Sequence, residues 1–194
     1  MLQRGRFLCA FLLIIVLSSF AFAAEFTVSI SNSEKWQDVY STMLIAGLQD
    51  ADSEFLVSTA HGPILANGIS SAHTAFIVSS EDAPFVFNYA DTLRARGFRS
   101  VEEIFVDNAN LDLLEEELPD IQNFIIVSND AGHNAVAVVQ YAKKTNSWVF
   151  LADRANIADI SQLLSERDVN DIIIYGYVDR EVREALDQYD PEII

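Results

Sequence analysis

The chain has 194 residues, a formal net charge of −17 and a single cysteine, Cys9. So acidic a surface repels nucleic acids and anionic lipids, and one cysteine excludes an internal disulfide framework. The first predicted element is a secretory signal over residues 1–23. In this segment two arginines precede an apolar run that ends in the small-x-small sequence Ala21-Phe22-Ala23.

The predicted signal also bears on the location of the protein. Because its apolar run is shorter than the roughly 20 residues of a membrane span, we expect cleavage rather than anchoring. The mature chain, residues 24–194, has no cysteine and no second apolar stretch of spanning length. Its size suits one soluble domain with a sizeable core. The sequence therefore predicts a secreted or cell-surface protein whose mature part does not insert into a membrane.

Short runs rich in Val, Ile and Phe alternate with stretches of helical periodicity along the mature chain. The predicted strands are 26–31, 54–59, 75–80, 101–106, 123–128, 147–152 and 171–175. The predicted helices are 36–51, 64–71, 83–96, 110–118, 134–143, 156–166 and 178–188. Continuous apolar strands are typical of a parallel sheet that is covered on both faces. The pattern predicts an α/β fold with parallel sheets of tandem βα repeats, Rossmann-like or flavodoxin-like.

The predicted strands recur about every 24 residues, and the sequence also contains a longer repeat of about twice this length. Residues 76–79 (FIVS) match 125–128 (IIVS) after 49 residues, and 107–111 (DNANL) match 153–157 (DRANI) after 46 residues. We therefore predict three βαβα blocks and a partial fourth, which span 26–74, 75–122, 123–170 and 171–194.

Four segments resemble the cell-wall-binding repeat type 2 family of exported archaeal and bacterial surface proteins. They are 35–40 (KWQDVY), 134–138 (NAVAV), 151–157 (LADRANI) and 172–186 (IIIYGYVDREVREAL). In the last segment a strand leads through Gly176 into a helix opened by valine, like the closing element of the family. The resemblance covers most of residues 26–194 and is closer to the archaeal members. It implies Rossmann-like repeats and a role in holding proteins at the cell envelope through wall polymers.

Polar side chains follow most of the predicted strands. In an open parallel sheet, ligands bind beyond the carboxyl ends of the strands. The candidate ligand-binding residues at this edge are Asn32, His61, Glu81, Asp107, Asn129, Asp130, His133, Asp153, Arg154, Tyr177, Asp179 and Arg180. Because this edge is mostly acidic, we expect it to tolerate divalent cations.

The richest polar cluster, residues 128–134 (SNDAGHN), has two interpretations. Ser128, Asp130 and His133 are the residue types of a hydrolytic triad, but a turn that caps the following helix explains them more simply. The three histidines of the chain are too far apart in sequence for a zinc site. The run 107–112 lacks the glycine and the final glutamate of a calcium loop. We therefore predict no catalytic residue, no resident metal and no cofactor.

Together these features predict a non-enzymatic protein of the cell surface that attaches to an envelope polymer or a surface-layer protein. One alternative is an extracytoplasmic module that binds or senses a small molecule in the crevice beyond the strands. A less favoured alternative is a hydrolase built around His133.

Overall fold

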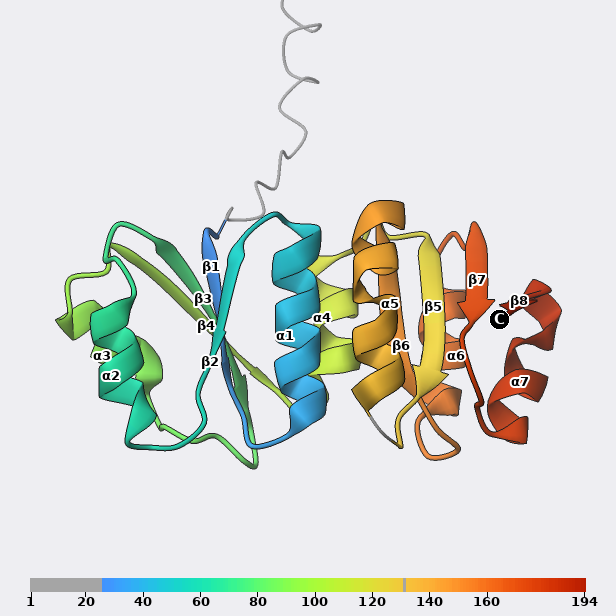
Figure 1. The fold of residues 1–194 in the computed structure, drawn as a ribbon, viewed down its shortest axis with the longest axis horizontal. Helices are drawn as coiled ribbons and strands as arrows, with labels where there is room; N and C mark the ends of the chain where they lie inside the picture. The colour runs from blue at the N-terminus through green and yellow to red at the C-terminus, as the bar shows by residue number, and fades with distance from the viewer. Residues whose placement is uncertain (1–25, 131) are drawn as a thin grey trace, which may run out of the picture.

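The computed structural model describes residues 26–130 and 132–194, so the predicted signal over residues 1–23 lies outside the described residues. Within them, strands and helices alternate along the chain (Figure 1). The strands are β1 (Val28–Asn32), β2 (Asp52–Phe55), β3 (Thr74–Ser80), β4 (Ser100–Val106), β5 (Asn123–Ser128), β6 (Ser147–Ala152), β7 (Asp171–Ile174) and β8 (Glu192–Ile193). The α-helices are α1 (Trp36–Leu48), α2 (His61–Gly68), α3 (Tyr89–Ala95), α4 (Ala109–Glu117), α5 (Gly132–Thr145), α6 (Ile157–Ser165) and α7 (Arg180–Leu186).

The predicted α/β fold class is confirmed, and every strand pair in the described residues is parallel. In this part of the chain, none of the helices combines the length and the apolar composition that a bilayer crossing requires. Strand β2 ends at Phe55, earlier than predicted, because its partner β1 ends one residue after the Ser31–Phe55 pair. Helix α3 begins only at Tyr89, and residues 81–88 form a loop instead of the first turns of a helix.

The strands form two separate four-stranded sheets, with the orders β2-β1-β3-β4 and β6-β5-β7-β8. Strands that hold the same position in the two orders also have similar spacing along the chain. The first residues of β1 and β5 are 95 residues apart, as are those of β2 and β6, and those of β3 and β7 are 97 residues apart. The chain therefore consists of two units of the same topology, a first unit (26–122) and a second unit (123–194).

This structural repeat is about twice as long as the repeat of 46–49 residues found in the sequence. The match between 76–79 and 125–128 aligns β3 with β5, but the counterpart of β5 in the strand order is β1. Two predicted βαβα blocks, 26–74 and 75–122, share the first sheet, and the change of sheet falls at the predicted boundary between 122 and 123.

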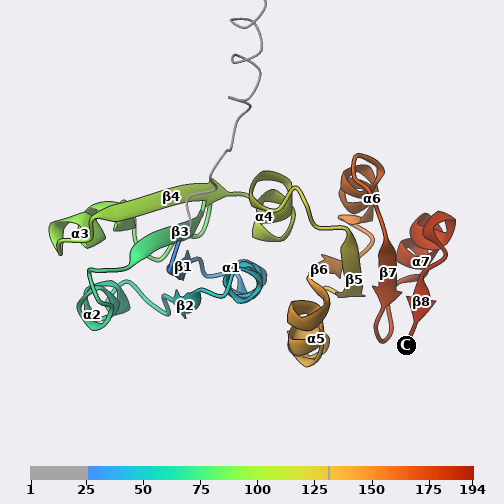
Figure 2. The same cartoon turned by 90° about the horizontal axis from the view of Figure 1, so that it is seen from above.

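Helices cover both faces of each sheet (Figure 2). Helices α2 and α3 lie on one face of the first sheet, and α1 and α4 lie on the other, where they separate it from the second sheet. Helix α5 lies on one face of the second sheet, and α6 and α7 lie on the other. Helix α1 packs against α4, α5 and β6, and one buried apolar cluster continues from α1 and α4 into the second sheet. The two units therefore share a core.

The side chain of Asn110 fixes this joint. Strand β6 is an edge strand of the second sheet, and the buried Asn110 amide donates to Val149 O and accepts from Leu151 N, both at 2.9 Å. The Trp148 indole N–H donates in turn to the backbone carbonyl oxygen of Asn110 at 3.0 Å. A side chain on α4 thus satisfies backbone groups of β6 that have no neighbouring strand.

Candidate functional site

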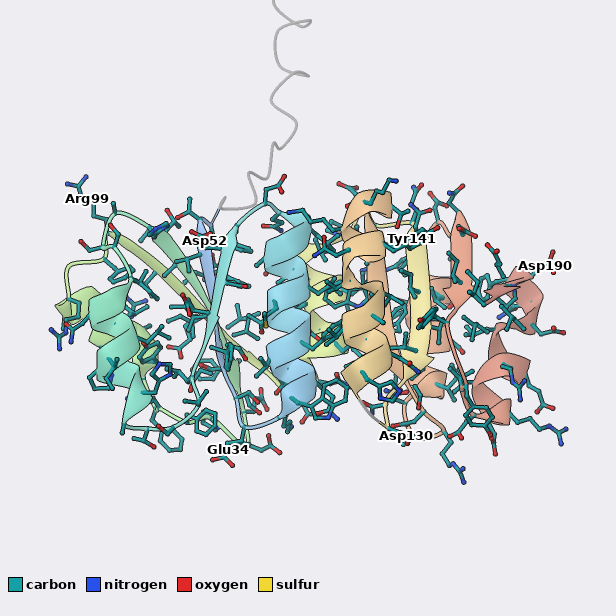
Figure 3. The ribbon with its side chains drawn as sticks, viewed as in Figure 1. Glu34, Asp52, Arg99, Asp130, Tyr141 and Asp190 are labelled. Atoms are coloured by element: carbon teal, nitrogen blue, oxygen red, sulfur yellow. The ribbon has the colours of Figure 1, made fainter. Side chains whose placement is uncertain are left out.

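The carboxyl ends of both sheets lie at the same long edge of the molecule. Figure 3 shows Glu34, which follows β1, and Asp130, which follows β5, on this edge, and Asp52 and Tyr141 on the opposite edge. Because the strands of the two units point the same way, their polar strand-end residues are brought to one side of the molecule, as expected for a parallel sheet.

A cavity of about 390 Å³ lies at this edge between the two units. We call it the inter-sheet cavity, and it is formed by the beginnings of α1, α4 and α6 and by the ends of β5 and β6. Its walls carry mainly amide and carboxylate side chains. The lining residues are Lys35, Gln37, Asp38, Asp107, Asn108, Asn110, Asn129, Leu151 and Asn156.

Asp38 is the most deeply buried carboxylate of this site. It accepts a hydrogen bond of 2.7 Å from the Ser33 hydroxyl and one of 3.3 Å from Ala109 N, and so links the first turn of α1 to the first turn of α4. Burial raises the pKa of Asp38 above its usual value, while the two hydrogen bonds and the charge of Lys35 act in the opposite direction. The site therefore holds a carboxylate at a cost in folding stability.

Replacing this carboxylate changes how stability depends on pH. A raised pKa means that the folded state binds the Asp38 proton more tightly than the unfolded state, whose value is near 3.8. The stabilising contribution of Asp38 is thus complete below that value and is lost as the pH rises through the folded pKa. The difference in Tm between Asp38→Asn and the wild type should increase from about pH 3 to about pH 7. A difference that stays flat across thermal melts in this range would contradict the assignment.

A second group of polar contacts crosses between the units. The Gln37 amide donates to Asn129 Oδ1 at 3.3 Å, and the Asn129 amide donates to Asp153 Oδ2 at 2.7 Å. Partial burial opposes ionisation of Asp153, but hydrogen bonds from Asn129 and from the backbone of Ala155 and Asn156 outweigh it and lower the pKa of Asp153. Asp153 is therefore ionised at neutral pH and orients Asn129 at the cavity wall.

Lys35 stands at the rim of the cavity and is already paired. Its ammonium group lies 2.8 Å from Asp82 Oδ1 and donates to Asp107 O at 3.2 Å, and the hydrogen bond to Asp82 raises the pKa of Lys35. In the described residues, the Asp107 carboxylate itself makes no hydrogen bond or ion pair, although its backbone does. Asp107 thus offers an uncommitted acceptor to a ligand.

Three of the predicted site residues, Asp107, Asn129 and Asp153, belong to the cavity or support its wall. Asp107 and Asn129 line it, and Asp153 binds the Asn129 amide. The sequence prediction missed most of the wall, because the larger part of it comes from the beginnings of helices and the smaller part from strand ends. A signal was present, since Asn110 and Asn156 occupy the same place in the repeated sequences 107–111 and 153–157.

The predicted residues of the first unit other than Asp107 lie away from the cavity lining. Asn32 is completely buried and binds Ser79 Oγ and the backbone of Val86, so it holds the loop after β3 in place. His61 begins α2, and Glu81 is exposed in the loop after β3. The structure does not bring Asn32, His61 and Glu81 together with Asp107 around one cavity.

Four predicted residues of the second unit lie on its surface near α7. Arg154 forms an ion pair with Asp179 at 3.5 Å, and Arg180 forms one with Glu184 at 2.6 Å. Both arginine side chains remain largely exposed, so these pairs contribute little to stability. Tyr177 is exposed beside them and does not line the inter-sheet cavity.

The residues of the possible hydrolytic triad form a turn. Ser128 Oγ donates to Asp130 Oδ2 at 3.0 Å, and Asp130 N donates to Ser128 Oγ at 3.2 Å. Over residues 26–130 and 132–194, no hydrogen bond joins His133 to Ser128 or to Asp130. His133 instead borders an apolar groove beside α1. This geometry is that of a local turn, and it does not relay a proton.

Among the residues that the structure describes, no three His, Cys, Asp or Glu side chains lie together in a group that could hold a metal ion.

Comparisons with protein-family models, with curated proteins and with solved structures found no match for this chain.

Proposed function

We propose that the chain is a non-enzymatic binding module of the cell surface, which attaches to an envelope polymer or a surface-layer component by holding a polar segment of it in the inter-sheet cavity. The observation that carries this proposal is the composition of the cavity wall. Amides that donate and accept, together with the uncommitted Asp107 carboxylate, suit the hydroxyl groups of a saccharide. The resemblance of the sequence to wall-binding repeats supports the same class of ligand.

The cavity wall is ordered before a ligand arrives. Asn129 is held between Gln37 and Asp153, and Asn110 is held by β6, so a ligand meets side chains that are already fixed. Pre-organisation reduces the entropy lost on binding and allows a small contact area to give useful affinity.

The charge of the chain restricts the ligand. With a net charge of −17 and Lys35 paired to Asp82, the cavity favours a neutral or cationic segment over an anionic one. An anionic wall polymer requires divalent cations between its own charges and those of the protein. Sensitivity to EDTA distinguishes the two cases.

The test is co-sedimentation of the purified protein with cell envelopes of its source organism, with and without EDTA. We expect saturable binding, and we expect Asp107→Ala to weaken it about tenfold, as for the loss of one charged hydrogen bond, with little change in Tm. The matched control is Asp52→Ala, which removes an exposed aspartate at the opposite edge (Figure 3). Equal binding by both variants would show that attachment does not use the cavity.

A small solute is the second candidate ligand, and the size of the cavity favours it. A volume of about 390 Å³ lies within the range of small-molecule sites. A free monosaccharide or polyol that raises Tm in proportion to the logarithm of its concentration would support this function. If a folded sample shows this shift in Tm but does not bind envelopes, the function is solute binding and not attachment.

A further inference from the structure

Two neighbouring residues of the inter-sheet cavity, Asp107 and Asn108, have a fixed backbone. Asp107 N and Asn108 N both donate to Asp112 Oδ2 at 3.1 Å. The Asp107 carbonyl accepts from Lys35 Nζ at 3.2 Å. The Asn108 carbonyl accepts from Asp112 N at 3.0 Å. These contacts hold the backbone of both residues in place, while both side chains line the cavity.

The two side chains offer complementary groups to a ligand. Within the described residues, the Asp107 carboxylate has no hydrogen-bond or ion-pair partner. Asn108 Oδ1 caps α4 by accepting from Asn110 N at 3.1 Å, which fixes the orientation of the side-chain amide. The NH2 group of this amide donates to no atom in the same part of the chain. The pair therefore presents one free acceptor and one free donor.

The second copy of the repeated sequence, 153–157, has no such pair. The Asp153 carboxylate, which corresponds to that of Asp107, accepts three hydrogen bonds. Arg154, at the place of Asn108, forms an ion pair and carries no amide. The same local sequence thus has its polar groups used by the structure in one unit and free in the other. Free groups on a fixed backbone, facing a cavity, indicate a ligand.

The placement of the two side chains restricts the shape of the group that they bind. Asn108 has extended backbone, with φ −135° and ψ 92°, and neighbouring side chains diverge in extended backbone. A group that lies between diverging side chains must present its donor and its acceptor on opposite sides. A trans secondary amide does so, because its N–H and its C=O point in opposite directions. A hydroxyl group has no such fixed arrangement.

We infer that the inter-sheet cavity recognises the acetamido group of an N-acetylated amino sugar. The amide N–H of the sugar donates to Asp107, and its amide oxygen accepts from the Asn108 NH2 group. Leu151 is the apolar member of the cavity lining and offers a contact to the acetyl methyl group. Gln37 Oε1 accepts no hydrogen bond within the described residues and is left for a ring hydroxyl. This assignment rests on the proposed function, which supplies the saccharide.

The test compares methyl β-D-glucopyranosides that differ only in the substituent of the second ring carbon, which is an acetamido, a hydroxyl or an ammonium group. Affinities come from the rise of Tm with ligand concentration, at a salt concentration that screens the attraction of an acidic chain for cations. We expect the acetamido sugar to bind the full chain about tenfold more tightly than the other two, because it alone satisfies both Asp107 and Asn108.

Two results with the unchanged protein would overturn the inference. One is an acetamido sugar that binds no more tightly than the hydroxyl sugar, or that gives no shift in Tm. The other is tightest binding of the ammonium sugar, which would assign Asp107 to a cationic ligand.

Asn108→Asp changes the donor alone. Aspartate keeps the oxygen that accepts from Asn110 N and caps a helix as well as asparagine does, so we expect the Tm without ligand to be retained. The variant should bind the acetamido sugar about tenfold more weakly and the ammonium sugar more tightly, so that their order is inverted. The matched control Asn67→Asp adds the same charge at an exposed position of α2 outside the cavity and should change neither affinity. An order that Asn108→Asp leaves unchanged contradicts the assignment.

A peptide amide presents the same two groups, so N-acetylglycine N-methylamide is titrated beside the sugars. Binding of this peptide as tight as that of the acetamido sugar would overturn the inference and assign the pair to a polypeptide. The result for attachment is separate. If the acetamido sugar binds but the protein does not sediment with envelopes, the inference holds and attachment fails. If the protein sediments with envelopes but does not bind the acetamido sugar, attachment holds and the inference fails.

Discussion

Asn110→Ala is expected to destabilise the protein by about 2–4 kcal/mol, because it removes three hydrogen bonds and leaves buried backbone groups of β6 without partners. Val149 O and Leu151 N lie on the outer side of an edge strand, and α4 excludes water from them. Ser41 Oγ, which accepts from the same amide, is also buried and loses this bond. The cost therefore comes mainly from the groups that remain behind.

The measurement is urea denaturation with linear extrapolation. The matched control is Asn170→Ala, which removes one hydrogen bond of 2.9 Å to Asn123 at an exposed position and should change the free energy of unfolding by less than about 0.5 kcal/mol. Because Asn110 joins the two units, its loss should also separate their unfolding and broaden the transition. A cooperative transition with an unchanged midpoint would show that the joint does not depend on this side chain.

Much of the fold could be predicted from the sequence because the strands are continuous apolar runs. Residues 123–128 and 147–152 were predicted with the bounds of β5 and β6, since both strands are buried on both faces and carry a strong signal. The predicted range for β2, 54–59, lies too far along the chain, because the exposed residues Asp52 and Glu54 of this strand give no apolar pattern. Strand β8 was missed, because two residues at an edge give no periodicity.

The arrangement of the units was harder to predict than the elements. Similar turns follow strands at equivalent edges, and so 107–111 and 153–157 match in sequence although they lie in different units. The topological repeat of 95–97 residues depends on which strands pair, and pairing is a long-range property that local similarity does not record. The inter-sheet cavity depends on the same pairing, because it exists only where the two units meet.

The candidate site shows a similar division. A strand-end rule places Asp107 and Asn129 at the correct edge, but it does not distinguish a side chain that faces the cavity from one that is used internally. Asn32 is the clearest case, because it ends β1 at the expected edge and yet is completely buried. Whether a polar residue is free for a ligand depends on its tertiary hydrogen bonds.

Asn32→Ala therefore tests the internal role against the predicted ligand-binding role. The Asn32 amide donates to Ser79 Oγ at 2.9 Å and to Val86 O at 2.7 Å, and it accepts from Val86 N at 3.0 Å. We expect a loss of about 1–3 kcal/mol in the free energy of unfolding, measured by urea denaturation, because the partly buried backbone groups of Val86 lose their partner and the buried site of Asn32 is left unfilled. Envelope binding by the folded fraction should be unchanged. Reduced binding with unaltered stability would instead show that Asn32 contacts the ligand.

The isosteric change Asn32→Asp separates geometry from hydrogen-bond polarity. It keeps the acceptor for Val86 N but places a carboxylate oxygen opposite Val86 O, and it buries a charge. Near neutral pH this variant should be less stable than Asn32→Ala. Burial raises the pKa of the introduced carboxyl, so its protonation on acidification favours the folded state and supplies an O–H donor to Val86 O. The variant should therefore gain stability relative to Asn32→Ala as the pH falls, and a constant difference between the two would show that position 32 is open to water.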